Sequence, residues 1–152
     1  MAYWLMKSEP DEFGIDDLAL KKCERWDGVR NYQARNFMRE MQEGDFIFMY
    51  HSSCKTVGIA GVMTVARAGY PDPSAEDPSS AYFDKKQPSE NRWTAVDVAF
   101  EERFAKVLTL EKIKQLAVND PRLSDLMLLS RSRLSVMPIS HEQWQCLMEH
   151  VR

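Results

Sequence analysis

The stretch "WDGVRNYQARNFMREMQEGDFIFMYHS", residues 26–52, predicts a helix followed directly by a buried strand. Apolar residues recur in it at the spacing i, i+3, i+4 and i+7, which is typical of a helix with one apolar face. They are Ala34, Phe37, Met38 and Met41. Asn31 is the natural N-cap of this helix. Gly44 is expected to end it, since glycine readily adopts the left-handed conformation past the last turn. The continuous apolar run 45–52 then predicts a strand buried on both faces.

Further strands are predicted on both sides of this unit. Upstream, "AYWLMK" (2–7) is short, aromatic and apolar, and the strand ends at Pro10. "GIDDLALKK" predicts one or two helical turns, and "ERWDGV" a short extended segment. The downstream strands are "TVGIAGVMTVARA", "RWTAVDVAFEERFAKV" and "RLSVMPI". In the first of these, Gly58 and Gly61 indicate a bulge or a close approach of two backbones.

The second half of the chain also contains helix starts. Thr109 is expected to cap a helix, and the pair Asp120–Pro121 to open another short one, because proline suits the first helical position. "SHEQ", residues 140–143, is a capping box before a last amphipathic helix. With no βαβ repetition, these elements predict an α+β fold: a mixed, mostly antiparallel β-barrel with peripheral short helices.

The composition is that of one ordinary globular domain covering residues 1–152. Hydrophobic residues make up 44% of the chain and charged ones 28%, which argues against disorder. A formal net charge of -3 excludes a globally basic nucleic-acid coat, so any nucleic-acid contact has to come from a local patch. We expect a monomer.

Targeting and metal-binding patterns are missing from the sequence. No apolar run is long enough to span a bilayer, and Lys7 and Glu9 interrupt the N-terminus before a signal-peptide core, so we predict a cytoplasmic protein without membrane contact. Cys23, Cys54 and Cys146 are widely spaced, which favours reduced thiols over a zinc site. We predict no metal and no cofactor.

The segment 69–92 differs from the rest. "GYPDPSAEDPSSAYFDKKQPSENR" is rich in proline and has no sustained period, and it is longer than structureless loops usually are. Its aromatic residues Tyr70, Tyr82 and Phe83 favour a loop that packs against the domain.

Common catalytic motifs are not found in the sequence: there is no nucleophile elbow, zinc-protease helix, P-loop or dinucleotide fingerprint. His51 stands beside Ser52, but neighbours on a strand point to opposite faces, so the pair does not indicate a triad. Binding uses the polar residues better. Arg30 and Asn31 lie at the predicted helix start, where backbone amides and the helix dipole attract anions such as phosphate. Trp26 is the best candidate for a wall that stacks an unpaired base.

Taken together, the motifs resemble the EVE domain family. The resemblance rests on "YWLMKSEPDEFGIDDL", "WDGVRNYQARNFMREMQEGDFIFMYHS", "GIAGV", "YPDP" and "RLSVMPIS", and it runs over about residues 2–150. It implies a PUA-like fold related to the YTH and ASCH domains. It also implies binding of nucleic acid with a modified base, either a modified cytosine in DNA or a modified RNA base.

The resemblance also implies a set of site residues. Matching positions expected in a base pocket are Lys7, Ser8, Glu9, Pro10, Trp26, Val29, Asn31, Tyr32, His51, Ser52, Leu134, Ser135 and Val136. Those expected at phosphates are Arg30, Arg35, Asn36 and Arg133. Ser8 and Trp26 are the strongest of these expectations. YTH domains use three aromatic walls, whereas only Trp26 maps here, with apolar Val29 and Leu134 in place of the others.

Three functions follow from these residues. The favoured one is a non-enzymatic module whose partner is nucleic acid carrying a modified base. The second is a hydrolase or nuclease on an ASCH-like barrel, with Lys7 or Glu9 as acid or base and Arg30 as an anion clamp. The third is a protein that binds a small anion or metabolite at the helix N-terminus.

Overall fold

The computed structural model describes residues 1–86 and 88–151, in which six strands form a sheet of order β2-β5-β4-β3-β1-β6. The strands are β1 (Tyr3–Ser8), β2 (Cys23–Trp26), β3 (Phe46–His51), β4 (Gly58–Pro71), β5 (Thr94–Thr109) and β6 (Val136–Ile139). β1 runs parallel to β3, and the other neighbouring pairs are antiparallel. The predicted α+β class and mostly antiparallel sheet are therefore confirmed.

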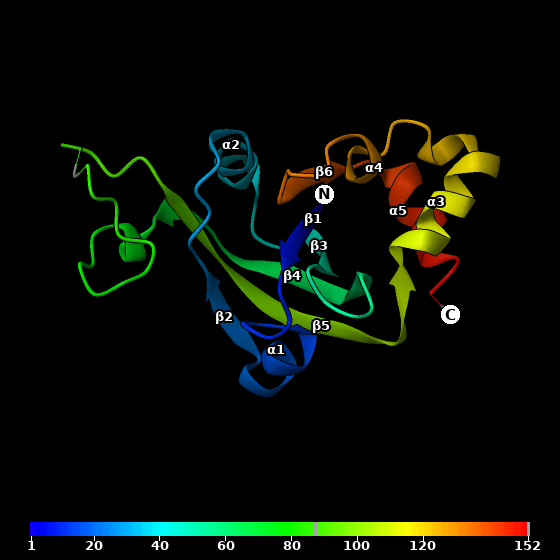
Figure 1. The fold of residues 1–152 in the computed structure, drawn as a ribbon, viewed down its shortest axis with the longest axis horizontal. Helices are drawn as coiled ribbons and strands as arrows, with labels where there is room; N and C mark the ends of the chain where they lie inside the picture. The colour runs from blue at the N-terminus through cyan, green and yellow to red at the C-terminus, as the bar shows by residue number, and fades with distance from the viewer. Residues whose placement is uncertain (87, 152) are drawn as a thin grey trace.

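The helices surround this sheet (Figure 1). They are α1 (Ile15–Lys21), α2 (Tyr32–Glu40), α3 (Leu110–Asn119), α4 (Met127–Ser130) and α5 (His141–Met148), with 3-10 turns η1 (Pro73–Ala75) and η2 (Pro121–Leu123). In Figure 1, α3, α4 and α5 gather at the end of the molecule near the C-terminus. The connection between β4 and β5 projects from the opposite end, and α1 and α2 lie on opposite sides of the strands.

The predicted helix starts are confirmed. Asn31 Oδ1 accepts a hydrogen bond from a first-turn N–H of α2 at 2.9 Å, and Thr109 Oγ1 does the same for α3 at 3.1 Å. Asp120 caps η2, and the Ser140 capping box opens α5. Because these caps use residues within three positions of one another, local sequence was sufficient to predict them.

The end of α2 differs from the prediction. The helix stops at Glu40, because Met41 adopts an extended backbone with ψ 142°. Gly44 does have a positive φ of 90°, but it lies in the turn that leads into β3. That turn is held by the carboxylate of Asp45, which accepts from the N–H of Gln42 at 2.9 Å. The prediction that Gly44 ends the helix is therefore wrong.

Close backbone approach at the β4 glycines is confirmed. A Cβ atom at Gly58 would lie 2.2 Å from the carbonyl oxygen of Leu108, and one at Gly61 would lie 2.3 Å from that of Glu102. The register between β4 and β5 shifts beside Gly61, as a bulge requires. These two positions need glycine because the neighbouring strand leaves no room for a side chain.

The sheet is not closed into a barrel, so the predicted closure is wrong. Its edge strands, β2 and β6, have four residues each and do not pair with one another. Side chains that flank both edges instead line one open cavity. The space where barrel closure would require backbone pairing is therefore occupied by a pocket.

The core is centred on the parallel pair β1 and β3. Both strands bury consecutive residues, and the side chains of Leu5, Met6 and Phe48 are completely inaccessible to solvent. Such continuous apolar runs are expected for strands covered on both faces. The predicted burial of β3 on both faces is confirmed.

The buried side chain of Asp45 connects β1 to the turn before β3 through hydrogen bonds. Its side chain is only 4% exposed and accepts from the indole N–H of Trp4 at 3.0 Å. It also accepts from the backbone N–H of Ala2 at 3.2 Å and from that of Gln42. One buried carboxylate thus satisfies donors from two segments that are distant in the sequence.

We expect Asp45→Ala to lower the free energy of unfolding by about 1–3 kcal/mol, because buried donors lose their acceptor. Urea denaturation of wild type and variant measures the change. Glu43→Ala, an exposed change in the same turn, is the control and should stay within about 0.5 kcal/mol of wild type. Equal stability of Asp45→Ala and Glu43→Ala would contradict the role of this carboxylate.

Candidate functional site

An open cavity of about 980 Å³ lies where the residues after β1 and β3 meet the end of β2 and the segment before β6. It collects most of the residues expected from the sequence. Those of the predicted base pocket that line it are Lys7, Ser8, Glu9, Trp26, Val29, Ser52 and Ser135, and those of the predicted phosphate set are Arg30 and Arg133. Strands that are far apart in the sequence thus contribute to one surface.

Backbone pairing brings the serines of the cavity together. The N–H of Ser52 donates to the carbonyl of Ser8 at 2.9 Å, and the N–H of Lys7 donates to the carbonyl of Ser135 at the same distance. The hydroxyl of Ser8 donates to the carbonyl of Phe13 at 2.5 Å. Because its proton is used there, the Ser8 oxygen can offer only lone pairs to a ligand. Ser8 is therefore an acceptor in the cavity.

Three aromatic side chains line the cavity, and the sequence identified one of them as a wall. Trp26 is only 8% exposed and meets Phe13 edge to face, with ring centroids 6.3 Å apart. Most of the indole belongs to the core, and its remaining surface faces the cavity. Tyr82 is 39% exposed and comes from the connection between β4 and β5. Sequence reasoning missed Phe13 and Tyr82 as cavity residues: Phe13 lies in a quoted motif but was not singled out, and Tyr82 lies in a segment without a sustained period.

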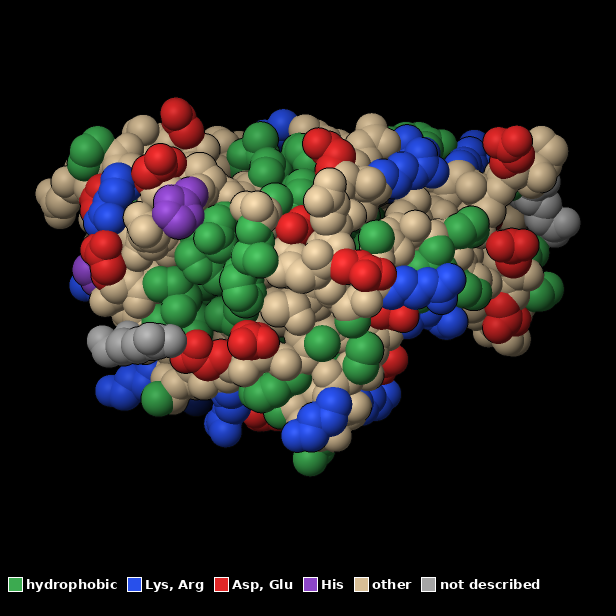
Figure 2. Space-filling view, turned by 180° about the vertical axis from the view of Figure 1, so that it is seen from behind, with side chains coloured by type: hydrophobic (Ala, Val, Ile, Leu, Met, Phe, Trp, Pro, Cys, Tyr) green, Lys and Arg blue, Asp and Glu red, His purple; other side chains and the backbone are tan. Residues whose placement is uncertain are grey.

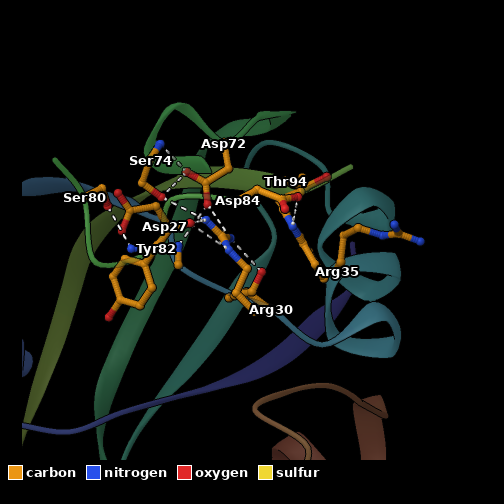
Figure 3. Close-up of polar contacts among 12 residues, drawn as sticks. Asp27, Arg30, Arg35, Asp72, Ser74, Ser80, Tyr82, Asp84 and Thr94 are labelled. Carbon is orange, nitrogen blue, oxygen red and sulfur yellow. Dashed lines mark hydrogen bonds and ion pairs between the residues drawn. The ribbon is translucent and has the colours of Figure 1, made fainter. Parts of the chain in front are cut away.

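The guanidinium group of Arg30 is fully occupied by hydrogen bonds to other residues of the protein. Its guanidinium forms an ion pair with Asp72 at 2.9 Å and also donates to Val29, Ser74 and Tyr82 (Figure 3). These contacts comprise five hydrogen bonds, as many as the group has N–H donors. Although Arg30 borders the cavity, its donors are committed to Val29 and to residues of the connection between β4 and β5. Phosphate binding by Arg30 stays a prediction, and in this geometry it would require these bonds to break.

Asp72 is the buried partner in this network. Its side chain is completely inaccessible, and it accepts from the N–H of Gly28 and from the N–H and hydroxyl of Ser74 as well as from Arg30. Burial raises the pKa of Asp72, but the hydrogen bonds from Ser74, Gly28 and Arg30 outweigh it, so the pKa lies below its ordinary value. The carboxylate therefore stays charged at neutral pH.

Asp84, within the same connection, bonds to the two residues that precede β5. Its carboxylate accepts from Arg92 at 2.8 Å and from the indole N–H of Trp93 at 3.0 Å. The Arg92 hydrogen bond lowers the pKa of Asp84 to about 2. The prediction that this proline-rich segment packs against the domain is confirmed by Asp72 and Tyr82, which both bond to Arg30, whereas the Asp84 bonds join two parts of the segment itself.

Two cations at the cavity differ from Arg30. Lys7 donates from Nζ to the carbonyl of Ser132 at 3.0 Å, and burial lowers its pKa. Arg133 is exposed. Neither takes part in an ion pair with the described residues, whereas Lys21 and Arg25 at the rim pair with carboxylates. Lys7 and Arg133 are therefore the cations best placed to meet an anion at this cavity.

The remaining predicted residues lie outside the cavity. They are Pro10, Asn31, Tyr32, His51, Leu134 and Val136 of the base-pocket set, and Arg35 and Asn36 of the phosphate set. His51 accepts the N–H of Ile15 through Nε2 at 3.1 Å and so caps α1. Leu134 and Val136 are buried in the core. Their assignment to a base pocket stays a prediction that this geometry does not favour.

Tyr32, Arg35 and Asn36 occupy the outer face of α2. Tyr32 stacks on Trp93 with ring centroids 5.0 Å apart, and Arg35 lies 4.8 Å from the Tyr32 ring centre and donates to Asn36. In Figure 3, Arg35 is directed away from Arg30 and Asp72. These side chains can reach a ligand only if it extends beyond the cavity.

Charge is mixed on the face of the molecule that Figure 2 shows. On the face shown in Figure 2, Lys and Arg side chains are scattered among Asp and Glu, and the largest continuous coloured area is hydrophobic. This distribution agrees with the net charge of -3. Attraction for a polyanion therefore has to come from local cations such as those at the cavity.

The family model of the EVE domain matches residues 2–150. The chain belongs to the EVE domain family. Thymocyte nuclear protein 1 of Danio rerio is 40% identical to this EVE domain over 161 residues, which cover 95% of the chain and 70% of that protein. The predicted family membership, with its near end-to-end extent, is confirmed.

Solved structures of other EVE domain proteins share the fold. A protein of Pseudomonas syringae has a TM-score of 0.91 and 52% identity, with 97% of this chain and 98% of that chain covered. Human thymocyte nuclear protein 1 (THYN1), in complex with DNA containing 5-methylcytosine, has a TM-score of 0.93 and 34% identity, with 100% and 99% covered. Thymocyte nuclear protein 1 is named as a nuclear protein, so it does not support the predicted cytoplasmic location. Among the described residues, no helix is long and apolar enough to cross a membrane.

The hydrogen bonds of Asp84 predict a specific acid sensitivity of this EVE domain. The folded pKa of about 2 lies below the ordinary value of 3.8, so the stabilisation from Asp84 is complete above pH 3.8 and is lost as pH falls through 2. The stability gap between wild type and Asp84→Asn should therefore narrow over that range in denaturant titrations. Asp125→Asn, at an exposed aspartate, serves as the control. A gap for Asp84→Asn that stays constant with pH would refute the role of these bonds.

Proposed function

We propose that this EVE domain is a nucleic-acid-binding module that recognises a modified base, with 5-methylcytosine in DNA as the preferred class. The observation that carries the proposal is the human relative, which covers the whole fold and is bound to DNA containing 5-methylcytosine. The cavity of this chain supplies a site of the required kind. It is large enough for a base with its sugar, since ligand pockets usually measure roughly 300–1,000 Å³.

The lining suits a cytosine ring. Ser8 accepts rather than donates, because its proton is used by Phe13, and the amino group of cytosine is a donor. Ser52 and Ser135 supply further hydroxyl groups close by. Val29 and the exposed part of Trp26 offer apolar surface on which a 5-methyl group loses contact with water. We therefore place the base between the serines and the aromatic side of the cavity.

The cations divide into two groups in this proposal. Lys7 and Arg133 meet the phosphates of the bound nucleotide, because they line the cavity without a carboxylate partner among the described residues. Arg35 and Asn36 contact the strand beyond it from the outer face of α2. Since the net charge is -3, non-specific attraction is weak and specificity rests on the base.

A short duplex with a single 5-methylcytosine should bind more tightly than the matched unmethylated duplex. Burial of one methyl group is worth about 0.8 kcal/mol, or roughly a fourfold preference. Ser8→Ala should weaken binding to both duplexes, because the cytosine amino group loses its acceptor. Fluorescence anisotropy at fixed salt measures these affinities, and RNA with the same modification forms a second arm. Identical, undetectable binding of every oligonucleotide at low salt would disprove the function.

The lowered pKa of Lys7 leads us to predict that DNA binding depends on pH. Since burial lowers its pKa, Lys7 loses its proton at a lower pH than an ordinary lysine, and DNA affinity should fall earlier in the alkaline range. Lys7→Arg, which stays charged, should remove this early fall. Lys7→Gln should bind more weakly throughout and reduce the slope of log affinity against log salt by about 0.9. The same pH profile for wild type and Lys7→Arg would exclude Lys7 from the contact.

The enzymatic alternative uses the same cavity, because Lys7 and Glu9 both line it. Incubation of the labelled duplexes followed by gel analysis tests it directly. Cleavage by wild type that disappears in Glu9→Gln would favour a nuclease over a binding module. The free nucleoside 5-methyl-2′-deoxycytidine tests the metabolite alternative: displacement of DNA by the nucleoside at low concentration would favour a small-molecule site.

A further inference from the structure

Tyr82 lines the cavity from a segment that carries no binding motif. It belongs to the connection between β4 and β5, its carbonyl is held by Arg30, and the residue remains 39% exposed. Figure 3 shows the ring directed away from the polar cluster that holds the backbone. A fixed backbone with a partly exposed ring is an arrangement suited to contact with a ligand.

Gly28 sets the place of the ring. A Cβ atom at position 28 would lie 2.8 Å from the Tyr82 ring, so the ring packs directly against the glycine backbone. Gly28 also has a φ of +78°, which side chains rarely adopt. One face of Tyr82 is thus supported by the turn that follows Trp26, the last residue of β2.

Arg30, two residues after Gly28, holds the backbone of Tyr82. Its Nη2 donates to the carbonyl of Tyr82 at 2.8 Å and its Nε donates to the same oxygen at 3.3 Å. The guanidinium carbon lies 5.7 Å from the Tyr82 ring centre, within the range of a cation–π contact. Asp72, inaccessible to solvent, holds the guanidinium in this orientation. Arg30 therefore connects the buried carboxylate to the position of the tyrosine.

We propose that Tyr82 is the outer wall against which the base stacks, and that Arg30 is the positioning residue that keeps Tyr82 at the cavity. The inference rests on the proposed function and deepens it. It names an aromatic wall supplied by the connection between β4 and β5, which complements the largely buried Trp26. It also gives Arg30 a role through Tyr82 in place of a phosphate contact.

Stacking accounts for the observations better than hydrogen bonding by the phenol. The ring has one face on Gly28 and retains exposed surface for a planar ligand, which is what base stacking on an aromatic side chain requires. Burial, together with the charges of Glu12, Asp27 and Glu9, raises the pKa of Tyr82, so the phenol is neutral at physiological pH. A neutral ring adds no repulsion towards phosphates.

The first test compares Tyr82→Ala and Tyr82→Phe on the methylated and unmethylated duplexes. Tyr82→Ala should weaken binding of the methylated duplex about 5- to 150-fold, the range for loss of one aromatic stack on a base. Tyr82→Phe keeps the ring and should bind like wild type. Ser79→Ala, in the same connection, removes a hydroxyl that contacts Asp77 and is the matched control. Wild-type affinity of Tyr82→Ala would overturn the inference, as would a loss in Tyr82→Phe equal to that in Tyr82→Ala.

The second test separates positioning by Arg30 from phosphate contact. Arg30→Gln should weaken binding while leaving the slope of log affinity against log salt unchanged, whereas loss of a phosphate contact would reduce that slope by about 0.9. In the Tyr82→Ala background, Arg30→Gln should add no further loss, because its effect passes through Tyr82. Additive losses or a reduced slope would overturn the positioning role. If Arg30→Gln does not fold by circular dichroism, Arg30→Lys, which keeps the charge and loses the fork, replaces it, and the absence of a further loss in the Tyr82→Ala background then decides the positioning role.

A fluorescent cytosine analogue at the methylated position gives a readout that a purely structural role does not move. Stacking on Tyr82 should quench its emission in wild type and Tyr82→Phe but not in Tyr82→Ala, each measured at saturating protein. Equal quenching in all three proteins would overturn the inference that Tyr82 stacks on the base. If wild type neither binds the duplexes nor discriminates between them, the proposed function itself fails. If wild type binds the methylated duplex and discriminates, and Tyr82→Ala binds that duplex as tightly as wild type, the inference alone fails.

Discussion

The parallel pairing of β1 with β3 is the constraint on which the rest of the structure depends. It makes both strands end at the same place, so Ser8 and Ser52 meet there, and the antiparallel contact with β6 adds Ser135. A slip of one residue in this register would move each side chain to the opposite face of the sheet. The complete burial of Leu5 and Phe48 makes such a slip costly, because it would expose core residues. The same apolar pattern that stabilises the core therefore also aligns the polar end of the cavity.

The second constraint is the ion pair between the buried carboxylate of Asp72 and the partly buried guanidinium of Arg30. Removal of a carboxylate from water is unfavourable, and a buried pair offsets this only when further hydrogen bonds satisfy both groups. Here Gly28 and Ser74 supply them for Asp72, and Tyr82 supplies a carbonyl acceptor for Arg30. The pair thus links the turn after β2 to the connection between β4 and β5. The ion pair therefore fixes the position of that connection relative to the turn after β2.

The elements of the fold were predictable from sequence where their causes are local. Asn31 and Thr109 cap helices through contacts within three residues, and the apolar run of β3 predicts its burial. The cavity was predictable only in part, because its members meet through pairing between distant strands. Arg30 shows the limit: its position before a helix indicates an anion site, but its partner Asp72 lies 42 residues away in a loop without a period. Closure of the barrel was mispredicted for a related reason, since no local pattern says whether two short edge strands pair.

In the proposed function, these contacts account for selective binding of nucleic acid by a chain with a net charge of -3. Because Arg30 is neutralised by Asp72, and the rim residues Lys21 and Arg25 by Glu24 and Asp27, much of the positive charge near the cavity is not available to phosphates. Non-specific affinity, which grows with the number of phosphates contacted, is then small. The base has to provide the larger share of the binding free energy, so discrimination between bases changes occupancy more than it would on a strongly basic surface. Internal pairing of cations is in this way a source of specificity as well as of structural order.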